Sequence, residues 1–375
     1  MSEKFRLRPA LKTTPAYVPG KPPKATEGLK TFKLSSNEHH MDPLPAVAEA
    51  IDAGGRAPAS YADPSVAELT AALADHLGVS ADTVLFSAGA SEMLKALFHI
   101  AVDPGDEVVY PWPSFEMYPQ LANLCGATHQ RISVDADGRH DLPAMAAAIS
   151  ERTRLVILCT PNNPTGPALR QDEFDAFMAQ VPSDVIVVLD EAYIDFCDAE
   201  DAADGLAALG QHPNLVLLRT FSKSYGLAGL RVGYAVADPE LIMELRKSIL
   251  PFSVSASAQQ AALVSLKHSQ DMEVRAKEVA RLRDDLAAGL RGLGYEVFEA
   301  HGNFVWLNLA ERSDDFEAAC LEAGLAVRNL KDGVRISVGP AEAMQRVLQV
   351  AGDFAADGGA VTDAGAPDKA EGAPK

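Results

Sequence analysis

Lys223 lies in a short stretch that also contains Arg231, eight residues further along the chain. The hydroxyl residues Thr220 and Ser222 precede the lysine. A lysine can form a Schiff base with an aldehyde, and guanidinium and hydroxyl groups can hold a phosphate. The stretch therefore suits a cofactor that carries both an aldehyde and a phosphate. An ordinary solvated loop is the alternative interpretation, and the motifs upstream decide between the two.

Polar motifs also follow several apolar runs that are typical of β-strands. In a parallel sheet such motifs meet at the carboxyl ends of the strands, where ligands bind. A helix that begins with small residues is a favourable phosphate site. Each motif alone is weak, but five loops at one sheet edge together predict one ligand site. The motifs are Gly89-Ala-Ser-Glu92 after residues 83–86, Pro111-Trp-Pro-Ser-Phe115 after 107–110, Thr160-Pro-Asn-Asn-Pro-Thr-Gly166 after 155–159, Asp190-Glu-Ala-Tyr193 after 185–189, and the Lys223 stretch after 214–218.

Strands and helices alternate between residues 83 and 218, and this pattern predicts the fold that positions the loops. The runs at 155–159 and 185–189 are apolar throughout, as expected for strands covered on both faces. The alternation indicates an α/β large domain with a mostly parallel sheet flanked by helices. After Gly294 the pattern changes and predicts a smaller α+β domain. Its strands are expected at 296–298, 303–309, 325–327 and 334–338.

Composition and periodicity divide the chain into four segments. The first 33 residues are rich in proline and lysine without a regular period, and the last 20 lack large apolar side chains. Residues 257–292 have the pattern of one or two long helices. The predicted segments are an N-terminal arm at 1–45 that joins the small domain, a large cofactor-binding domain at 46–250, a small C-terminal domain at 251–355 and a disordered tail at 356–375.

Charge and cysteine content argue against several classes of function. The 375-residue chain carries a formal net charge of −19, so we expect no nucleic-acid partner and no anionic-membrane partner. Its four cysteines form no Cys-x-x-Cys pair, which argues against a disulfide framework and a zinc site, and no metal site is predicted. Isolated cysteines, together with the lack of an apolar signal segment or of an apolar run of about 18 residues, predict a cytoplasmic protein.

The order of the motifs resembles that of one enzyme family. Asn-Asn-Pro-Thr-Gly, then Asp-Glu-Ala-Tyr, then Ser-Lys-x-x-x-Leu-Ala-Gly-Leu-Arg is similar to the class II branch of the fold-type I aminotransferases, which use pyridoxal phosphate. The resemblance covers about residues 10–350. It is nearest to the histidinol-phosphate aminotransferase branch, and within it to aromatic amino acid aminotransferases of actinobacterial type. The markers are Tyr17-Val-Pro-Gly-Lys21, Leu34-Ser-Ser-Asn-Glu38, Pro43-Leu-Pro45, Trp112-Pro-Ser-Phe-Glu116, Arg219-Thr-Phe-Ser-Lys223, Pro251-Phe-Ser-Val254 and Asn303-Phe-Val-Trp306.

The resemblance implies a role for each residue around the cofactor. Lys223 would carry the covalent bond to pyridoxal phosphate and, once released, move the proton of the substrate's Cα. Asp190 would keep the pyridine nitrogen protonated, and Phe115 would stack on the ring. Tyr193 and Asn163 would bond the phenolic oxygen of the ring. The phosphate would be held by Ala90, Ser91, Thr220, Ser222 and Arg231.

The resemblance also implies how the substrate and a second subunit are bound. Arg335 would hold the substrate's carboxylate through a bidentate fork, with Arg328 as a second candidate. A plain arginine on a strand surface is the alternative for Arg335. Tyr17 and Asn163 are also expected to contact the substrate. Tyr61 resembles a tyrosine that reaches the phosphate in the neighbouring subunit, which implies a homodimer.

The sequence departs from the family pattern at three places. The loop expected as Asn-Glu-Asn-Pro-x-Gly is Asn37-Glu-His-His-Met-Asp-Pro43 here, so the contacts of this loop do not carry over. The expected Tyr-Pro-Asp is Tyr61-Ala-Asp63. The ring-stacking residue is Phe115 in place of tyrosine, which keeps the aromatic face and loses a hydroxyl group.

Four functions are compatible with these residues. The expected one transfers the amino group of an aromatic L-amino acid (phenylalanine, tyrosine or tryptophan) to 2-oxoglutarate. The second keeps this chemistry with histidinol phosphate as the donor, whose phosphate Arg335 and Arg328 would bind. The others are a cofactor-binding regulator without turnover and a different reaction, such as decarboxylation, at the same cofactor. The intact Lys223, Asp190 and Arg335 speak against the regulator.

Overall fold

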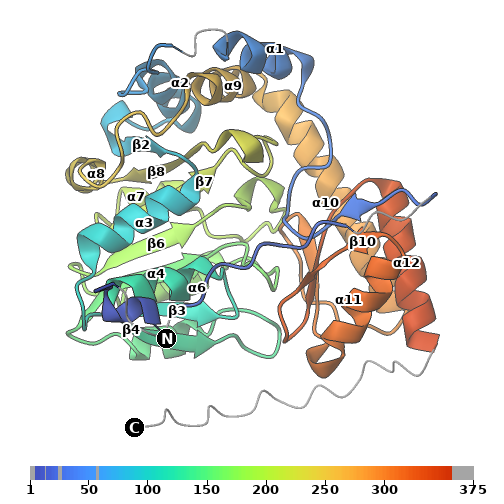
Figure 1. The fold of residues 1–375 in the computed structure, drawn as a ribbon. Coiled ribbons are helices and arrows are strands. Elements are labelled where there is room, and N and C mark those ends of the chain that lie inside the picture. Colours follow the sequence, from blue (N-terminus) through green and yellow to red (C-terminus); the bar gives the residue numbers. More distant parts are fainter. Residues whose placement is uncertain (1–4, 13, 24–27, 56–58, 357–375) are drawn as a thin grey trace.

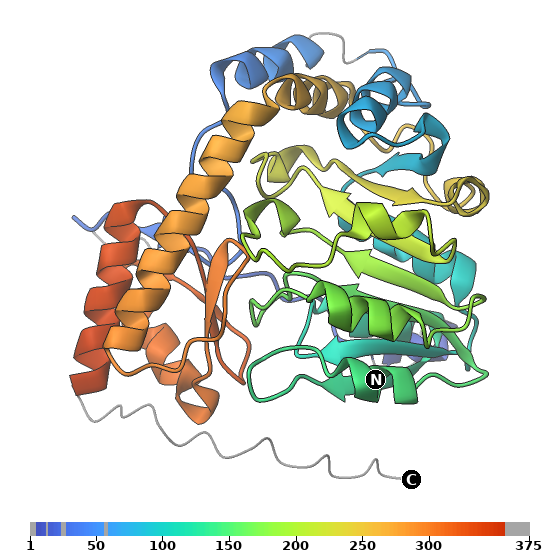
Figure 2. The same ribbon diagram turned by 180° about the vertical axis from the view of Figure 1, so that it is seen from behind.

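The computed structural model describes residues 5–12, 14–23, 28–55 and 59–356. The described chain forms two bodies joined by one long helix, α10 (Ser269–Gly292), as Figure 1 and Figure 2 show from opposite sides. The larger body contains a sheet between two layers of helices. Within the described ranges, no helix combines the length and the apolar character that crossing a membrane requires.

The described part of the large body is organised around a seven-stranded sheet. The strand order is β2-β8-β7-β6-β5-β3-β4, and β8 alone runs antiparallel to the others. The predicted α/β fold with a mostly parallel sheet is therefore confirmed. The sequence does not predict β8, which begins directly after the Arg231 loop. The bounds are β2 Val84–Ser87, β3 Glu107–Trp112, β4 Thr128–Ser133, β5 Thr153–Cys159, β6 Ile186–Asp190, β7 Leu215–Thr220 and β8 Gly233–Ala237.

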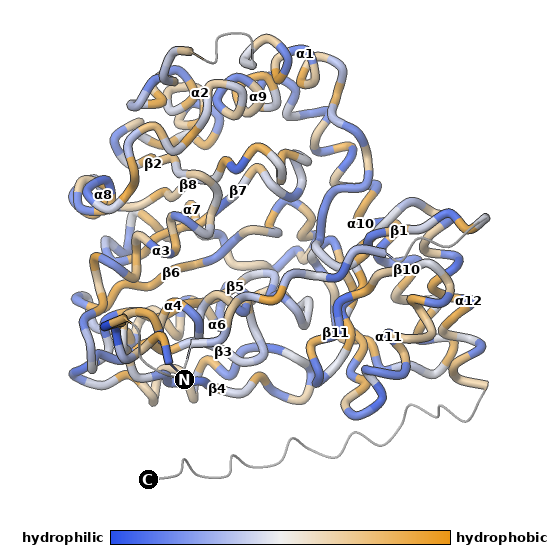
Figure 3. Tube along the Cα trace, in the orientation of Figure 1, coloured by the Kyte–Doolittle hydropathy of each residue, from blue (hydrophilic) through white to orange (hydrophobic). Residues whose placement is uncertain are grey.

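Successive residues of the central strands face opposite helical layers. In β6, Val187 and Leu189 pack into one hydrophobic core and Val188 into another, as the two-residue period of a strand requires. Both faces are covered, which explains why these strands are apolar throughout, as Figure 3 shows. The Val188 side is covered by α3 (Ala90–Ala101), α4 (Met117–Cys125) and α8 (Pro239–Arg246), and the other side by α1 (Pro45–Gly54), α2 (Ala67–Leu77), α5 (Leu142–Ala147), α6 (Gln171–Met178), α7 (Gly205–Leu209) and α9 (Ala256–Lys267).

The small body has its own core and two small sheets. Strands β11 (Arg328–Asn329), β12 (Val334–Ser337) and β9 (Phe304–Leu307) form an antiparallel sheet in that order. The arm strand β1 (Phe32–Lys33) pairs in parallel with β10 (Leu325–Ala326). Helices α11 (Ser313–Glu322) and α12 (Ala341–Ala356) pack with α10 around them. Short 3₁₀ helices lie at Pro9–Lys12, Ala81–Thr83, Ile194–Phe196, Ala228–Leu230 and Ala310–Arg312.

The two hydrophobic cores divide the chain within α10. Met272 still packs into the core of the large body, whereas Ala276 belongs to the core of the small one. The two cores therefore separate within α10, because the buried face of α9 packs on α1 and α2. The domain bounds given above stay a prediction. The strand expected at 296–298 is wrong, since the structure has only the isolated bridge of Val297 with Leu307 there. The disordered tail is predicted for residues 356–375, and all of these except Ala356 lie outside the described residues.

Candidate active site

The five predicted loops meet at the carboxyl edge of the sheet and line a cavity of about 300 Å³. This volume lies at the lower end of the range of small-molecule sites. Parallel strands bring these loops together because their carboxyl ends share one edge. The wall also includes Ser36, Glu38 and Cys159. All ten cofactor residues that the sequence predicts from within one subunit line it, namely Ala90, Ser91, Phe115, Asn163, Asp190, Tyr193, Thr220, Ser222, Lys223 and Arg231.

Lys223 lies in the loop after β7 and reaches the arm that enters from the small body. Its Nζ atom donates to the carbonyl oxygens of Ser36 and Asn37, both at 3.3 Å. Burial lowers the pKa of this amine to about 7, and the nearby charge of Arg335 acts in the same direction. A large fraction of the amine is therefore neutral near pH 7, as a nucleophile must be.

Asp190 is the last residue of β6 and is 4% exposed. The hydroxyl of Tyr118 donates to one carboxylate oxygen at 2.7 Å, and the backbone amide of Ala192 donates to the other at 3.2 Å. Burial raises the pKa of Asp190 to about 6, and the two hydrogen bonds oppose that rise. The carboxylate is therefore mostly ionised at pH 7 and can hold a cationic ring nitrogen.

Tyr193 and Asn163 connect the cavity to the small body. The hydroxyl of Tyr193 accepts a hydrogen bond from the side-chain amide of Asn37 at 3.0 Å. Burial raises the pKa of Tyr193 to about 12, so its hydroxyl keeps its proton at pH 7 and can donate to a ligand oxygen. The side-chain oxygen of Asn163 accepts from Arg335.

The amino end of α3 provides unoccupied N–H groups at one end of the cavity. No side chain of the described residues caps this helix, whose first residues are Ala90 and Ser91. The first N–H groups of an α-helix have no partner inside the helix, and the helix dipole favours an anion there. This end of the cavity therefore suits a phosphate.

Hydroxyl groups and a guanidinium face the same end. The hydroxyls of Thr220 and Ser222 are 2.9 Å apart, and Arg231 donates to Ser222 at 3.3 Å. Gly89 has a φ of +86°, and a Cβ there would lie 2.3 Å from Nη2 of Arg231. The missing side chain of Gly89 thus lets the guanidinium lie against the start of α3.

The two predicted substrate arginines belong to the small body and are not among the residues that line the cavity, but Arg335 contacts Asn163 of its wall. Arg335, on β12, is 7% exposed and donates to Asn163 and, at 2.9 Å, to the carbonyl oxygen of Ser35. Its buried Nε has no partner in the described part of the chain. Arg328, on β11, forms an ion pair with Glu116 at 2.7 Å. The two predicted substrate arginines are therefore close together, but Arg328 already has an anionic partner.

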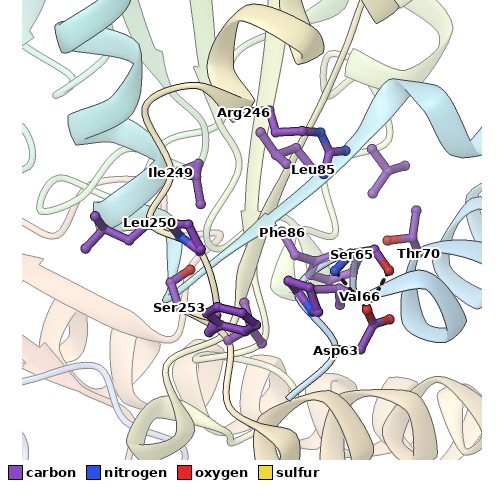
Figure 4. Close-up of a pocket in the computed structure, with 15 residues that line it drawn as sticks. Asp63, Ser65, Val66, Thr70, Leu85, Phe86, Arg246, Ile249, Leu250 and Ser253 are labelled. Carbon is purple, nitrogen blue, oxygen red and sulfur yellow. Dashed lines mark hydrogen bonds between the residues drawn. The ribbon is translucent and has the colours of Figure 1, made fainter. Parts of the chain in front are cut away.

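Tyr61 and Tyr17 do not line the cavity. The ring of Tyr61 is 85% exposed and stacks on Phe252 with centroids 4.5 Å apart. Phe252 belongs to a separate cavity of about 180 Å³, whose wall includes Arg246 and Leu250 and contains none of the predicted cofactor residues (Figure 4). Tyr17 is 49% exposed and lies near enough to Arg335 to influence its pKa.

Comparison with known proteins identifies the family. The family model described as "Aminotransferase class I and II" matches residues 30–350. The chain belongs to this family. It is thus an aminotransferase that depends on pyridoxal phosphate, and the resemblance recognised in the sequence is confirmed.

Relatives of this aminotransferase are similar along almost the whole chain. The aromatic amino acid aminotransferase of Streptomyces coelicolor is 43% identical over 350 residues, which cover 93% of this chain and 97% of the relative. The enzyme of the same name from Rhodococcus opacus is 45% identical over 338 residues, or 90% and 92% of the two chains. Among solved structures, the histidinol-phosphate aminotransferase of Sinorhizobium meliloti with pyridoxal phosphate has a TM-score of 0.84 and 26% identity, and covers 95% of this chain and 99% of that one.

The cavity of the aminotransferase fits pyridoxal phosphate. The uncapped start of α3 and the space left by Gly89 form an anion cradle, and Asp190 supplies a buried carboxylate for a ring nitrogen. The amine of Lys223, whose pKa burial lowers to about 7, suits an aldehyde. Phe115 contributes an aromatic wall. We therefore assign the cofactor's phosphate, ring and aldehyde to these groups as a proposal.

The sequence misses several residues of the site. Tyr118 donates to Asp190 from α4, and Asn37 contacts both Tyr193 and Lys223. Tyr118 follows the predicted ring-stacking residue Phe115 by only three residues, and this closeness in sequence is a usable signal. Asn37 carries no comparable signal, because its partners are more than 100 residues away in sequence.

Proposed function

We propose that this aminotransferase moves the amino group of an aromatic L-amino acid to 2-oxoglutarate, giving the aromatic 2-oxo acid and L-glutamate. The observation that carries the choice of substrate is the 42–45% identity to curated relatives named aromatic amino acid aminotransferase, over about nine-tenths of the chain. The site supports it, since Lys223 and Asp190 line one cavity and Arg335 donates to Asn163 of the same wall.

Several residues of the cavity contribute to moving the proton of the substrate's Cα. Bound pyridoxal phosphate supplies an aldehyde that accepts the amino group and a ring that withdraws electrons from the substrate's Cα. The neutral Nζ of Lys223 removes the proton from that carbon, and its pKa of about 7 suits this role near neutral pH. Asp190 would hold a proton at the ring nitrogen of the cofactor, and Tyr118 keeps this carboxylate in place. Tyr193, whose hydroxyl keeps its proton, would donate to the cofactor's phenolic oxygen.

Arg335 positions the substrate. Its guanidinium is anchored by Asn163 and Ser35, both neutral acceptors, so its positive charge is left for the substrate's carboxylate. The buried Nε without a partner adds a donor for that group. Water is largely excluded around this buried guanidinium, which strengthens the charge–charge attraction.

A homodimer completes the proposed site. Tyr61 does not line the cavity of its own chain, and its exposed ring is available to a second copy of the chain. Its hydroxyl would reach the phosphate end of the partner's cavity. Such a contact explains why a large aromatic side chain is exposed at a sequence position that resembles an interface residue.

A cytoplasmic location belongs to the same proposal. All four cysteines are free thiols, and three of them are buried. Free thiols persist in a reducing compartment. Measuring the enzyme's distribution in fractionated cells tests this point.

Histidinol phosphate is the second candidate donor. Solved histidinol-phosphate aminotransferases share the fold, at 26% identity for the Sinorhizobium meliloti enzyme. That identity is well below the 43–45% shared with the aromatic enzymes of Streptomyces coelicolor and Rhodococcus opacus. The ion pair of Arg328 with Glu116 also weighs against a phosphorylated donor.

The test is a titration of the holoenzyme with phenylalanine, tyrosine and histidinol phosphate in separate experiments, followed by the absorbance of the bound cofactor. We expect the absorbance to change at low concentrations of the aromatic acids and at much higher concentrations of histidinol phosphate, and 2-oxoglutarate should restore it. The opposite order would assign histidinol phosphate as the donor. No spectral change with any of the three would overturn the proposed function.

A further inference from the structure

Arg328 and Arg335 are direct partners across the antiparallel strands β11 and β12. Residues in this relation point to the same face of a sheet and lie close together. Both are largely buried, with 8% and 7% of their surface exposed. Two adjacent buried cations would form a strong binding position for a dianion such as a phosphate monoester, provided that neither is neutralised.

The two arginines differ in the groups that accept their hydrogen bonds. Arg335 donates to the neutral side chain of Asn163 and to a backbone carbonyl oxygen. Arg328 donates through Nη2 to both carboxylate oxygens of Glu116, at 2.9 Å and 2.7 Å, and to the carbonyl oxygen of Val18 at 2.8 Å. The charge of Arg335 is therefore free for an incoming anion, whereas that of Arg328 is matched by Glu116.

Glu116 reaches Arg328 from the large body. It immediately precedes α4 and follows Phe115, whose side chain lines the cofactor cavity. Burial lowers the pKa of Arg335, the charge of Arg328 acts in the same direction, and the charge of Glu116 opposes both. The Glu116–Arg328 pair thus borders the proposed substrate position on the side of Phe115.

We propose that Glu116 is a specificity-determining residue that neutralises Arg328, and thereby favours substrates with one anionic group and an uncharged side chain over phosphate monoesters. This inference deepens the proposed function and rests on it. A phosphate that approached Arg328 would either displace the carboxylate of Glu116 or lie beside it. The first costs an ion pair and the second brings like charges together, so both weaken binding. An aromatic amino acid needs only Arg335.

The experiment compares wild-type holoenzyme with Glu116→Gln. Glutamine keeps the size of the side chain and one acceptor for Arg328, and removes the charge. The measurement is kcat/KM for phenylalanine and for histidinol phosphate. We expect kcat/KM for histidinol phosphate, divided by kcat/KM for phenylalanine, to rise roughly tenfold to a hundredfold in the variant. The rise should come mainly from a lower KM for histidinol phosphate.

Two further variants separate the charge of Glu116 from other effects. Glu173→Gln removes one negative charge from a surface ion pair with Arg139 and should leave the ratio unchanged. In the double variant Glu116→Gln with Arg328→Gln, the gain should disappear, because the released charge is that of Arg328. A purely structural role of Glu116 would instead lower kcat/KM for both substrates and leave their ratio unchanged, which would contradict the inference.

A binding measurement gives a second readout that does not depend on turnover. Inorganic phosphate, titrated calorimetrically into the holoenzyme, should bind Glu116→Gln roughly tenfold more tightly than wild type, and the double variant should lose this gain. This inference alone is overturned if wild type is active on phenylalanine but Glu116→Gln binds phosphate no more tightly than wild type and shows the same ratio of kcat/KM for the two substrates. A wild type inactive on phenylalanine overturns the proposed function, and the phosphate titration then still decides whether Glu116 neutralises Arg328.

Discussion

Replacing Gly89 by alanine tests the phosphate end of the site directly. Gly89 precedes α3 with φ +86° and ψ 159°, a conformation that is almost confined to glycine. A Cβ atom there would lie 2.3 Å from Nη2 and 2.9 Å from Cζ of Arg231. The end of a flexible arginine can move away at little cost to the fold, but it would then leave the position proposed for binding the phosphate.

The expected magnitude has two parts that different measurements report. The strained backbone costs about 1–3 kcal/mol in the free energy of unfolding of the cofactor-free protein. Loss of a charged hydrogen bond from Arg231 to the phosphate costs about 1.5–3 kcal/mol in cofactor binding. The dissociation constant of pyridoxal phosphate should therefore rise roughly tenfold to a hundredfold.

The assay is a titration of cofactor-free protein with pyridoxal phosphate, followed by absorbance, together with thermal unfolding of the cofactor-free protein. Gly210→Ala is the matched control, because Gly210 has φ −68° and, its chain neighbours aside, no atom of the described residues lies within 4 Å of an added Cβ. This control should bind the cofactor like wild type. In an Arg231→Ala background, Gly89→Ala should weaken cofactor binding little further, since the two changes remove the same contact.

Wild-type cofactor affinity in a folded Gly89→Ala protein would refute the proposed placement of Arg231. Additive losses in the double variant would also contradict it, because the two residues would then act independently. Loss of folding alone would show up in the thermal unfolding of the cofactor-free protein and is thereby distinguished from loss of the phosphate contact.

Four other outcomes follow from the site. Asp190→Asn should keep the cofactor bound, as its absorbance will show, but lower kcat about a hundredfold, because the ring nitrogen loses its ionic partner. In cofactor-free protein, the reaction of Lys223 with trinitrobenzenesulfonate should increase up to about pH 7 and then level off, because its pKa is lowered to about 7. A labelling midpoint near pH 10 would disprove the lowered pKa of Lys223. Between pH 7 and 10.5, Lys223 binds fewer protons in the folded protein than in the unfolded chain, so its contribution to stability falls as pH drops through that window. Arg335→Lys should raise KM for phenylalanine roughly tenfold or more in steady-state assays, since an ammonium cannot form the bidentate fork. Tyr61→Phe should weaken cofactor binding about fivefold without changing the thermal unfolding of cofactor-free protein, because the hydroxyl is proposed to contact only the partner's ligand; unaltered cofactor affinity would contradict that contact.

The sequence by itself determined the architecture of the large body and most of the cofactor cavity. Apolar runs between helical segments specify parallel strands, and parallel strands bring the residues that follow them to one edge. Lys223, Asp190 and Asn163 each come just after such a run, so their neighbourhood follows from local patterns alone. The order of the motifs then identified the cofactor, because several such loops in one order indicate a cofactor far more specifically than any single loop does.

Only the tertiary structure decided which distant segments meet around that edge. Asn37 lies against Tyr193 and Lys223 because the arm crosses from the small body, and nothing in its local sequence predicts that path. The division of the cores within α10 likewise follows from how α9 packs on α1 and α2. The partner of Arg328 is another such case, since Glu116 is more than 200 residues away in sequence. Local periodicity specifies strands and helices, whereas pairings between remote side chains depend on how the two bodies pack against each other.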